Sequence, residues 1–232
     1  MGNISIYCIF IILAFLINII ISILYLKNVR KFQILLICLI EDIGIIVGAK
    51  ILDIVIYLKE YIFLFNSDID LLEIAKKVFM QGYIFYGGFF GAMISLLICS
   101  KIFKIKILKL FNILIPNLIL FYGIAKIGCY FNECCKGIYI ENKRIPIQLI
   151  ESMICFCIYL YIFLKGKGNN NCKNKMVPLS LLFYSLLRFT AEFLRDTESK
   201  KILFLTVNQA ISLPIIVKSI NLLKKGDEKC QF

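Results

Sequence analysis

Long runs of apolar residues follow one another along the chain, separated by short polar segments. The first run covers residues 4–26 almost without interruption. A helix needs about 20 such residues to cross a bilayer, whereas a membrane barrel would show short alternating segments. The sequence therefore predicts an all-α membrane protein with seven transmembrane helices, at residues 4–26, 32–57, 79–100, 107–127, 146–164, 177–195 and 203–223.

Basic residues concentrate in every second connection between the predicted helices. Segments 27–31, 101–109 and 165–175 carry net charges of +3, +4 and +4, whereas segment 59–77 carries −1. Cytoplasmic loops of helical membrane proteins hold an excess of Lys and Arg. We therefore expect the N-terminus outside and the C-terminus in the cytoplasm. The longest loops have only about 20 residues, so we expect one polytopic membrane domain, residues 1–232.

Composition agrees with this interpretation and narrows the chemistry. Hydrophobic residues make up 60% of the chain and charged residues 18%, which excludes an ordinary soluble domain and a disordered chain. The net charge of +12 would suggest nucleic acid in a soluble protein. Here it reports topology, and we expect no nucleic-acid partner. The chain has no histidine, so the usual carrier of protons at neutral pH is missing.

Ionisable residues inside the second predicted helix need an explanation, because buried charge is costly in a membrane. Glu41, Asp42, Lys50 and Asp53 lie there. At about 100° per residue, Asp42 and Asp53 share a face. One alternative is a structural ion pair that faces the bundle interior. The other is the coupling site of a small transporter, which internal inverted repeats would favour, and we see no such repeats.

The sixth predicted helix carries a narrow polar stripe. Tyr184, Arg188, Glu192 and Arg195 are spaced 4, 4 and 3 residues apart and share one helical face. Two guanidinium groups on one face suit a phosphate, because each presents a planar fork of donors. Glu192 can fix an arginine rotamer or act as a base. The alternative is an Arg-Glu-Arg packing network, but the stripe favours an anionic head group.

Two other segments are expected at the same depth in the outer leaflet. Tyr86-Gly87-Gly88 opens the third helix, where Gly87 and Gly91 form a small-xxx-small pattern that permits close helix packing or close approach of a ligand. Lys126 lies near the outer end of the fourth. We expect Tyr86, Lys126, Arg188 and Arg195 to converge on one cavity, which would favour an anionic phospholipid.

Three cysteines follow the fourth helix, at positions 129, 134 and 135. Three alternatives stay open for this cluster. A metal site would normally need a fourth ligand, and no histidine exists to supply it. Two of the cysteines could form a disulfide on the outer face. An unreactive turn is the third alternative. We expect no cofactor and no metal ligands.

The motifs of the chain resemble those of the prolipoprotein diacylglyceryl transferase family along nearly its whole length. The Tyr-Arg-Glu-Arg stripe is intact, and so is the family's Pro-x-Gln-Leu-x-Glu motif at residues 146–151. Segment 125–137, AKIGCYFNECCKG, is similar to the family signature Gly-Arg-x-(Gly/Ala)-Asn-Phe-x-Asn-x-Glu-x-x-Gly. A C-terminal Gln-x-x-Ser-x-Pro motif resembles Gln209, Ser212 and Pro214.

The resemblance implies a multi-pass enzyme of the bacterial inner or plasma membrane. Such an enzyme transfers the diacylglyceryl group of phosphatidylglycerol to the lipobox cysteine of prolipoproteins, the first step of lipoprotein maturation. Its implied partners are phosphatidylglycerol, prolipoprotein signal peptides and the lipid bilayer. The implied catalytic residues are Tyr86, Arg188 and Glu192. The implied substrate-binding residues are Lys126, Arg195, Tyr184, Gly87, Gly88, Asn132, Gly137, Gln148 and Glu151.

The chain also departs from the family pattern. The histidine of the family's third helix is Tyr86 here, and the signature arginine is Lys126. Cys129 and Cys134 replace the signature's first asparagine and its glutamate, and its first glycine is Ala125. Without histidine, the candidate bases for the acceptor thiol are Tyr86, Glu192, Glu151 or a cysteine. The alternative function is that of a divergent relative that binds anionic lipid or modifies a different acceptor.

Overall fold

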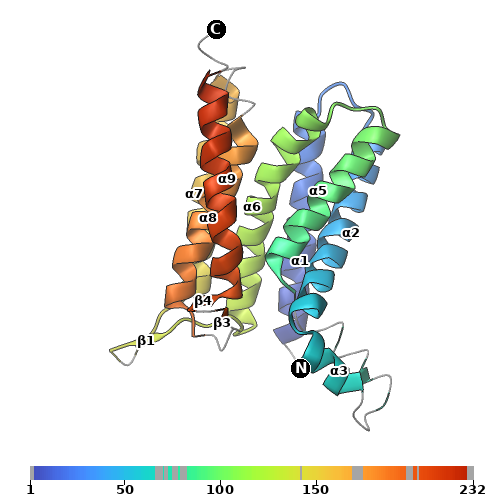
Figure 1. Cartoon of the computed structure of the whole chain (residues 1–232). Helices are drawn as coiled ribbons and strands as arrows, with labels where there is room; N and C mark the ends of the chain where they lie inside the picture. The colour runs from blue at the N-terminus through green and yellow to red at the C-terminus, as the bar shows by residue number, and fades with distance from the viewer. Residues whose placement is uncertain are drawn as a thin grey trace. The chain divides into compact units, whose positions relative to one another are not determined.

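The computed structural model describes residues 3–65, 70, 73–74, 78, 83–141, 143–168, 175–196, 201–202 and 204–228. This part of the chain is predominantly helical (Figure 1). The helices are α1 (Asn3–Tyr25), α2 (Lys31–Ile56), α3 (Leu58–Phe65), α5 (Phe85–Ile102), α6 (Ile107–Phe131), α7 (Ile147–Gly168), α8 (Met176–Ala191) and α9 (Val207–Glu228).

Each of the seven predicted spans coincides with one long helix, in the expected order. Within the described ranges, five helices are long and apolar enough to cross a membrane, namely α1, α5, α6, α7 and α8. The prediction of a helical membrane protein is confirmed at this level. The helices α2 and α9 coincide with the predicted spans 32–57 and 203–223 but fall outside this group.

The chain forms two compact units. The first unit comprises residues 1–28 and 108–232 and contains α1, α6, α7, α8 and α9. The second unit comprises residues 29–107 and contains α2, α3 and α5. Since the structure does not place the units relative to one another, each is described by itself.

The second unit is built on the close packing of α2 against α5. A Cβ atom added to Gly48 would overlap the carbonyl oxygen of Gly87, and one added to Gly91 would overlap that of Gly44. These four glycines therefore let the two backbones touch, as small-xxx-small patterns do in membranes. Close helix packing through Gly87 and Gly91 is confirmed.

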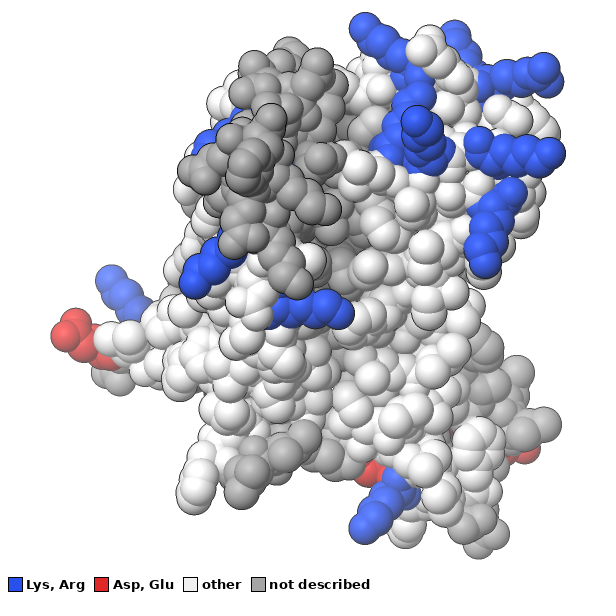
Figure 2. All heavy atoms as spheres, turned by 45° about the horizontal axis from the view of Figure 1, so that its top comes forward, with Lys and Arg blue, Asp and Glu red and all other residues white. Residues whose placement is uncertain are grey.

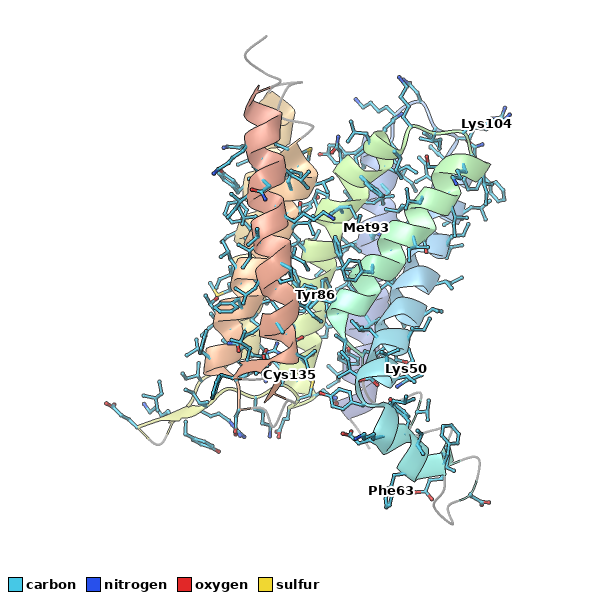
Figure 3. The ribbon with its side chains drawn as sticks, in the orientation of Figure 1. Lys50, Phe63, Tyr86, Met93, Lys104 and Cys135 are labelled. Atoms are coloured by element: carbon cyan, nitrogen blue, oxygen red, sulfur yellow. The ribbon has the colours of Figure 1, made fainter. Side chains whose placement is uncertain are left out.

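The two ends of the second unit differ in charge. In Figure 3, Lys104 lies at the end of α5 that is opposite to α3 and Phe63. Lys101, Lys104 and Lys106 follow one another at that end, and Figure 2 shows Lys and Arg side chains gathered on one region of the surface. These three lysines belong to segment 101–109, which the charge pattern predicts to be cytoplasmic.

In the first unit, α6 packs against α1 and α7 through small or polar residues. Asn117 of α6 donates a hydrogen bond from Nδ2 to Oδ1 of Asn18 in α1, at 3.0 Å. Gly128 of α6 lies against Tyr7, and Gly123 lies against Cys155 of α7. The positions without a large side chain thus mark where the neighbouring helices approach α6 most closely.

Short irregular elements join these helices at one end of the first unit. The strands β1 (Tyr139–Ile140) and β2 (Lys143–Arg144) pair antiparallel between α6 and α7. The strands β3 (Lys201–Ile202) and β4 (Leu205–Thr206) pair antiparallel before α9. A 3-10 helix, η2 (Glu192–Leu194), follows α8. Most of the predicted site residues of this unit lie at this end.

The predicted span 177–195 agrees with the helical segment Met176–Leu194, but the polar stripe does not lie on one continuous α-helix. The α-helix ends at Ala191, and Arg195 has extended backbone angles. The reason lies in tertiary hydrogen bonds. The Ile138 amide donates to the Leu194 carbonyl at 3.0 Å, and the Asp196 amide donates to the Lys136 carbonyl at 3.0 Å. The loop after α6 thus pairs with this segment in place of a further helical turn.

Candidate functional site

A single buried carboxylate, Glu151 near the start of α7, gathers three cations from other segments. Lys126 Nζ of α6 lies 2.9 Å from Glu151 Oε2, and Arg195 Nη2 lies 2.7 Å from the same oxygen. Arg188 Nη1 of α8 lies 3.4 Å from Oε1. Glu151 is fully buried. Three residues that are distant in sequence are thereby held around one point.

Neighbouring polar groups extend this cluster. Tyr122, one helical turn before Lys126, donates its hydroxyl to Glu151 Oε1 at 3.4 Å and packs edge-on against the ring of Tyr184. Glu192 Oε2 lies 3.3 Å from Arg188 Nη2, and Asn208 of α9 donates to Glu192 at 3.3 Å. All four residues of the predicted stripe therefore belong to, or contact, one buried network.

The charges of the network do not balance. Among the residues that the structure describes, Lys126, Arg188 and Arg195 contribute three positive charges, and Glu151 and Glu192 contribute two negative charges, which leaves +1. All five side chains are buried. Uncompensated charge is expensive in an environment of low polarity, so a site of this kind favours an anion. Within the described part of the chain, the buried Nε of Arg195 has no hydrogen-bond partner and can donate to one.

Several residues predicted to bind substrate also make structural contacts, and their role in binding stays a prediction. Gln148 donates from Nε2 to the carbonyl of Cys134 at 2.7 Å and so fixes the turn after α6. Gly137 pairs with Arg195 in a β-bridge, and a Cβ atom there would overlap the Ile145 carbonyl oxygen. Asn132 closes the end of α6 through its backbone amide, which donates to the Gly128 carbonyl at 2.9 Å. These residues hold the loop that carries Arg195.

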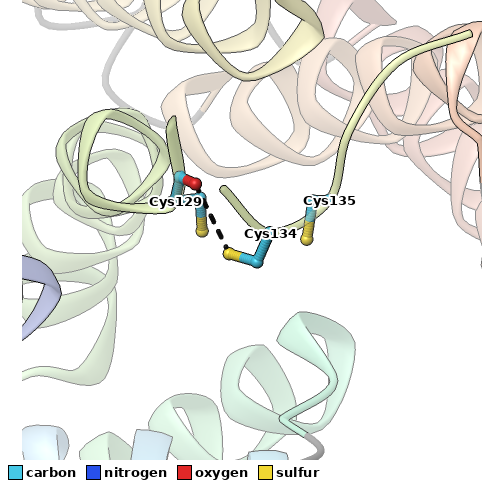
Figure 4. Close-up of side chains that lie close together, drawn as sticks. All are labelled: Cys129, Cys134 and Cys135. Carbon is cyan, nitrogen blue, oxygen red and sulfur yellow. Dashed lines mark hydrogen bonds between the residues drawn. The ribbon is translucent and has the colours of Figure 1, made fainter. Parts of the chain in front are cut away.

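The turn after α6 brings the three cysteines together. Their sulfur atoms all lie within 4.8 Å of one another, and Figure 4 shows the side chains grouped on one side of the turn. Cys134 Sγ donates to the carbonyl of Cys129 at 3.6 Å. Glu133 and Cys135 have positive φ angles of 52°, which reverse the chain sharply. All three cysteines are free thiols.

Neighbouring groups change the acidity of one of these thiols. Hydrogen bonds from Cys129 and Cys134 lower the pKa of Cys135, and the positive charges of Lys126 and Arg195 add to this effect. The cysteine turn therefore lies within electrostatic reach of the cation cluster.

Tyr86, Gly87 and Gly88 lie in the second unit, at the start of α5. Tyr86 is buried (Figure 3), and Gly87 and Gly88 pack against α2. Since the units are not placed relative to one another, the expected convergence of Tyr86 with Lys126, Arg188 and Arg195 stays a prediction. Within the first unit, the other three residues do come together around Glu151.

The charged residues of α2 form a separate arrangement. Lys50 Nζ lies 3.5 Å from Asp53 Oδ2 and donates to the Tyr61 hydroxyl at 2.7 Å, and Tyr61 in turn donates to Asp53. Figure 3 shows Lys50 near the end of α2 that leads into α3. The structural alternative for Lys50 and Asp53, an ion pair, is confirmed.

Two members of the network, Tyr122 and Asn208, were not predicted from the sequence. Tyr122 precedes Lys126 by four residues, so helical spacing alone could have placed both on one face. Asn208 precedes Gln209, which the C-terminal motif contains. Gln209 itself caps α9, because its Oε1 accepts from the Thr206 amide at 3.0 Å while its own amide donates to Thr206 Oγ1 at 3.3 Å. The polar contact to the network therefore comes from Asn208, the residue before the motif.

The profile of the family described as prolipoprotein diacylglyceryl transferase matches residues 1–224. The chain belongs to this family. The resemblance of the motifs to this family is thereby confirmed for nearly the whole chain. The buried network of arginine, glutamate and lysine residues lies in the first unit.

Individual relatives agree with the family match. A phosphatidylglycerol–prolipoprotein diacylglyceryl transferase 2 of Clostridium perfringens is 28% identical over 61% of this chain and 61% of its own length. A transferase of the same name from Clostridium tetani is 26% identical over 77% of this chain and 74% of its own. The Rickettsia bellii transferase is 31% identical over 80% of this chain and 75% of its own. The chain thus aligns with about three fifths to three quarters of each relative.

Proposed function

We propose that this protein transfers the diacylglyceryl group of phosphatidylglycerol to the lipobox cysteine of prolipoproteins, the first step of lipoprotein maturation. The observation that carries the proposal is the buried cluster of Lys126, Arg188 and Arg195 around Glu151, with one positive charge in excess. Family membership supports the same reaction, because the aligned relatives are named for these two substrates.

The cations supply what the leaving group needs. In the proposed reaction the acceptor sulfur forms a bond to the glyceryl carbon, the carbon–oxygen bond to the phosphate breaks, and glycerol phosphate leaves with the electron pair. Negative charge grows on the phosphate oxygens as the bond breaks. Arg188 and Arg195 present planar forks of donors, and Lys126 adds a point charge, so the cluster stabilises that charge where it develops.

The acceptor thiol must lose its proton, since the thiolate is the nucleophile. Glu151 is a poor candidate for the base, because its oxygens already accept from Lys126, Arg195, Arg188 and Tyr122. Glu192 is a better one. Its contacts to Arg188 and Asn208 are longer, at 3.3–3.4 Å. Tyr86 is assigned an orienting role, because an unperturbed phenol is largely protonated at neutral pH.

The proposed setting is the inner or plasma membrane of a bacterium. There residues 1–232 form one polytopic domain with seven spans, the N-terminus outside and the C-terminus in the cytoplasm. The alternation of basic loops supports this topology. It is tested by labelling Cys172, which lies outside the described residues, with an impermeant thiol reagent. No labelling in intact cells is expected, and strong labelling without permeabilisation contradicts the topology.

A second candidate function is the binding of anionic lipid without transfer, or transfer to a different acceptor. It is favoured by one observation, the tyrosine at position 86 where the family pattern has histidine. The two functions share the phosphate-binding cluster and differ in whether the expected product forms.

The deciding experiment is complementation of a bacterium depleted of its own transferase, combined with an assay on purified protein. The assay follows the transfer of labelled diacylglyceryl from phosphatidylglycerol to a lipobox peptide. Restored growth and a labelled thioether product are expected. A protein that binds phosphatidylglycerol but labels neither the peptide nor any cellular prolipoprotein would establish the second candidate instead.

A further inference from the structure

We propose that Cys129, Cys134 and Cys135 bind a thiophilic divalent metal ion such as Zn²⁺, and that its open fourth position binds and activates the acceptor thiol. This inference rests on the proposed function for the identity of the acceptor. The metal site itself is argued from the geometry of the cysteine turn.

The three sulfur atoms are already grouped as ligands of one ion would be. They lie within 4.8 Å of one another. In a tetrahedral zinc site with bonds of about 2.3 Å, neighbouring sulfurs are about 3.8 Å apart, so a contraction of about 1 Å completes the arrangement. Cys129 lies in the last turn of α6, while Cys134 and Cys135 lie on the turn that follows this helix (Figure 4).

The backbone around the cysteines is held from several directions. The Cys134 amide donates to the Cys129 carbonyl at 3.1 Å, and Gln148 Nε2 donates to the Cys134 carbonyl at 2.7 Å. Immediately after the turn, Gly137 pairs with Arg195. A metal site needs such support, because ligands on a fixed backbone lose less entropy on binding.

A set of only three ligands points to a catalytic site. Structural zinc sites in proteins are closed by four protein ligands, whereas catalytic sites keep three and leave one position to water or substrate. The chain has no histidine. Among the described residues, the potential metal ligands grouped here are the three cysteine sulfurs. The missing fourth ligand argues against a structural metal site. It leaves an open coordination position, which an acceptor thiol needs in order to bind the metal.

The position of the cluster joins the two substrates of the proposed reaction. Arg195, which is proposed to bind the phosphate, forms a β-bridge with Gly137, two residues after Cys135. Lys126 precedes Cys129 by one helical turn of α6. A thiol bound at the cysteines would therefore lie beside the lipid phosphate.

The chemical step balances with these groups. The acceptor thiol releases its proton to the general base of the proposed function as it binds the metal, because a coordinating thiol is deprotonated. The resulting thiolate attacks the glyceryl carbon, a carbon–sulfur bond forms, and the carbon–oxygen bond breaks. The phosphate leaves with that electron pair, and the thioether, a weaker ligand than a thiolate, dissociates from the metal. No oxidant or reductant is consumed. A metal would thus supply the thiol activation that the absent histidine cannot.

The test uses the purified full-length chain in lipid nanodiscs, reduced, stripped of metal with a chelator and titrated with Co²⁺ without oxygen. Thiolate-to-cobalt charge-transfer absorption and the visible bands of tetrahedral cobalt are expected, with one ion per chain. Cys129→Ser and Cys135→Ser should each weaken cobalt binding by more than about a hundredfold, since losing a ligand costs more than losing a supporting contact. Cys157→Ser, which changes an exposed cysteine outside the cluster, is the matched control and should bind normally.

A second measurement tests the open position. A lipobox peptide with one cysteine is added to the cobalt-loaded protein, and a matched peptide with serine serves as its control. Only the cysteine peptide should shift the visible bands. The inference is overturned if the reduced protein with three free thiols gives no charge-transfer band, or if the cysteine peptide leaves the spectrum unchanged.

The two proposals can fail separately. Normal transfer by the metal-free, reduced protein would overturn this inference and leave the proposed function intact. Cobalt binding and a peptide-dependent shift without any thioether product would overturn the proposed function and retain the site. A disulfide between two of the cysteines in the protein as isolated, seen by mass spectrometry as resistance to alkylation without prior reduction, would also exclude the metal site.

Discussion

Two clusters of charged residues in this protein differ in how they are built. In the second unit, Lys50 pairs with Asp53 three residues away, and Tyr61 of α3 completes the contact. In the first unit, Glu151 of α7 collects Lys126, Arg188 and Arg195 from segments up to 69 residues apart in the chain (195 − 126). One cluster is local and balanced between its cation and its carboxylate, whereas the other is assembled by tertiary packing and carries an excess positive charge.

The difference shows how a structural ion pair can be told from a ligand site. Lys50 and Asp53 lie on adjacent turns of one helix and satisfy each other together with the Tyr61 hydroxyl. A carboxylate shared by three cations leaves hydrogen-bond donors and positive charge unmatched. Because unmatched charge is costly in a membrane, such a site favours an anionic ligand. The following substitutions test this distinction, in order of decreasing expected effect on transfer.

The largest loss is expected for Glu192→Gln. If Glu192 is the base, the neutral amide cannot accept the thiol proton, and transfer should fall by about 10² to 10⁴-fold. The amide still accepts hydrogen bonds from Arg188 and Asn208, so the fold should persist. The measurement is the rate of transfer at saturating phosphatidylglycerol. Glu133→Gln, which alters an exposed carboxylate in the same unit, serves as the control, and equal rates for both variants would exclude Glu192 as the base.

Arg188→Lys should follow, with a loss of about a hundredfold, comparable to removing one donor from a charge-stabilising site. Lysine keeps the positive charge but loses the planar fork that reaches both Glu151 and Glu192. Transfer is measured together with the amount of folded protein in the membrane. Arg144→Lys removes the fork from an exposed ion pair in the same unit and should leave transfer within about threefold. Near-normal transfer by Arg188→Lys would rule out bidentate recognition of the phosphate.

Tyr86→Phe is expected to reduce transfer by about tenfold, the worth of one hydrogen bond between neutral groups. The change removes the hydroxyl and almost no volume, so packing around this buried residue should be preserved. Lipid binding is measured separately from turnover. A loss of a thousandfold or more with lipid still bound would mean that the phenol is itself the base, and would shift that role away from Glu192.

The smallest effect on transfer is expected in the second unit. Lys50→Met alone leaves Asp53 without its cation and should lower the thermal unfolding midpoint, since removing one partner of a buried pair costs about 3–5 kcal/mol. Lys50→Met combined with Asp53→Leu should recover most of that stability. Transfer per folded molecule should stay within about threefold in both variants. A large loss of transfer in the stable double variant would show that this pair belongs to the function.

The long helices were predictable because their signal is local. Apolar runs of bilayer length appear in the sequence, and each coincides with a helix whose hydrogen bonds are made within the segment. The spacing of Lys50 and Asp53 likewise placed both on adjacent turns. The end of α8 was not predictable in this way. There, hydrogen bonds with residues 136 and 138 take the place of a further helical turn, and no local sequence pattern around Arg195 predicts them.

The sequence by itself determined which residues are polar within apolar helices, and so which residues the site can contain. It placed Arg188, Glu192 and Arg195 on one stripe and Glu151 in a neighbouring motif. Only the tertiary structure decided that Glu151 is the shared acceptor of Lys126, Arg188 and Arg195, and that Cys129, Cys134 and Cys135 meet in one turn. The physical reason is that helical periodicity fixes the direction of a side chain around its own axis, whereas helix packing and loop hydrogen bonds fix which axes lie together.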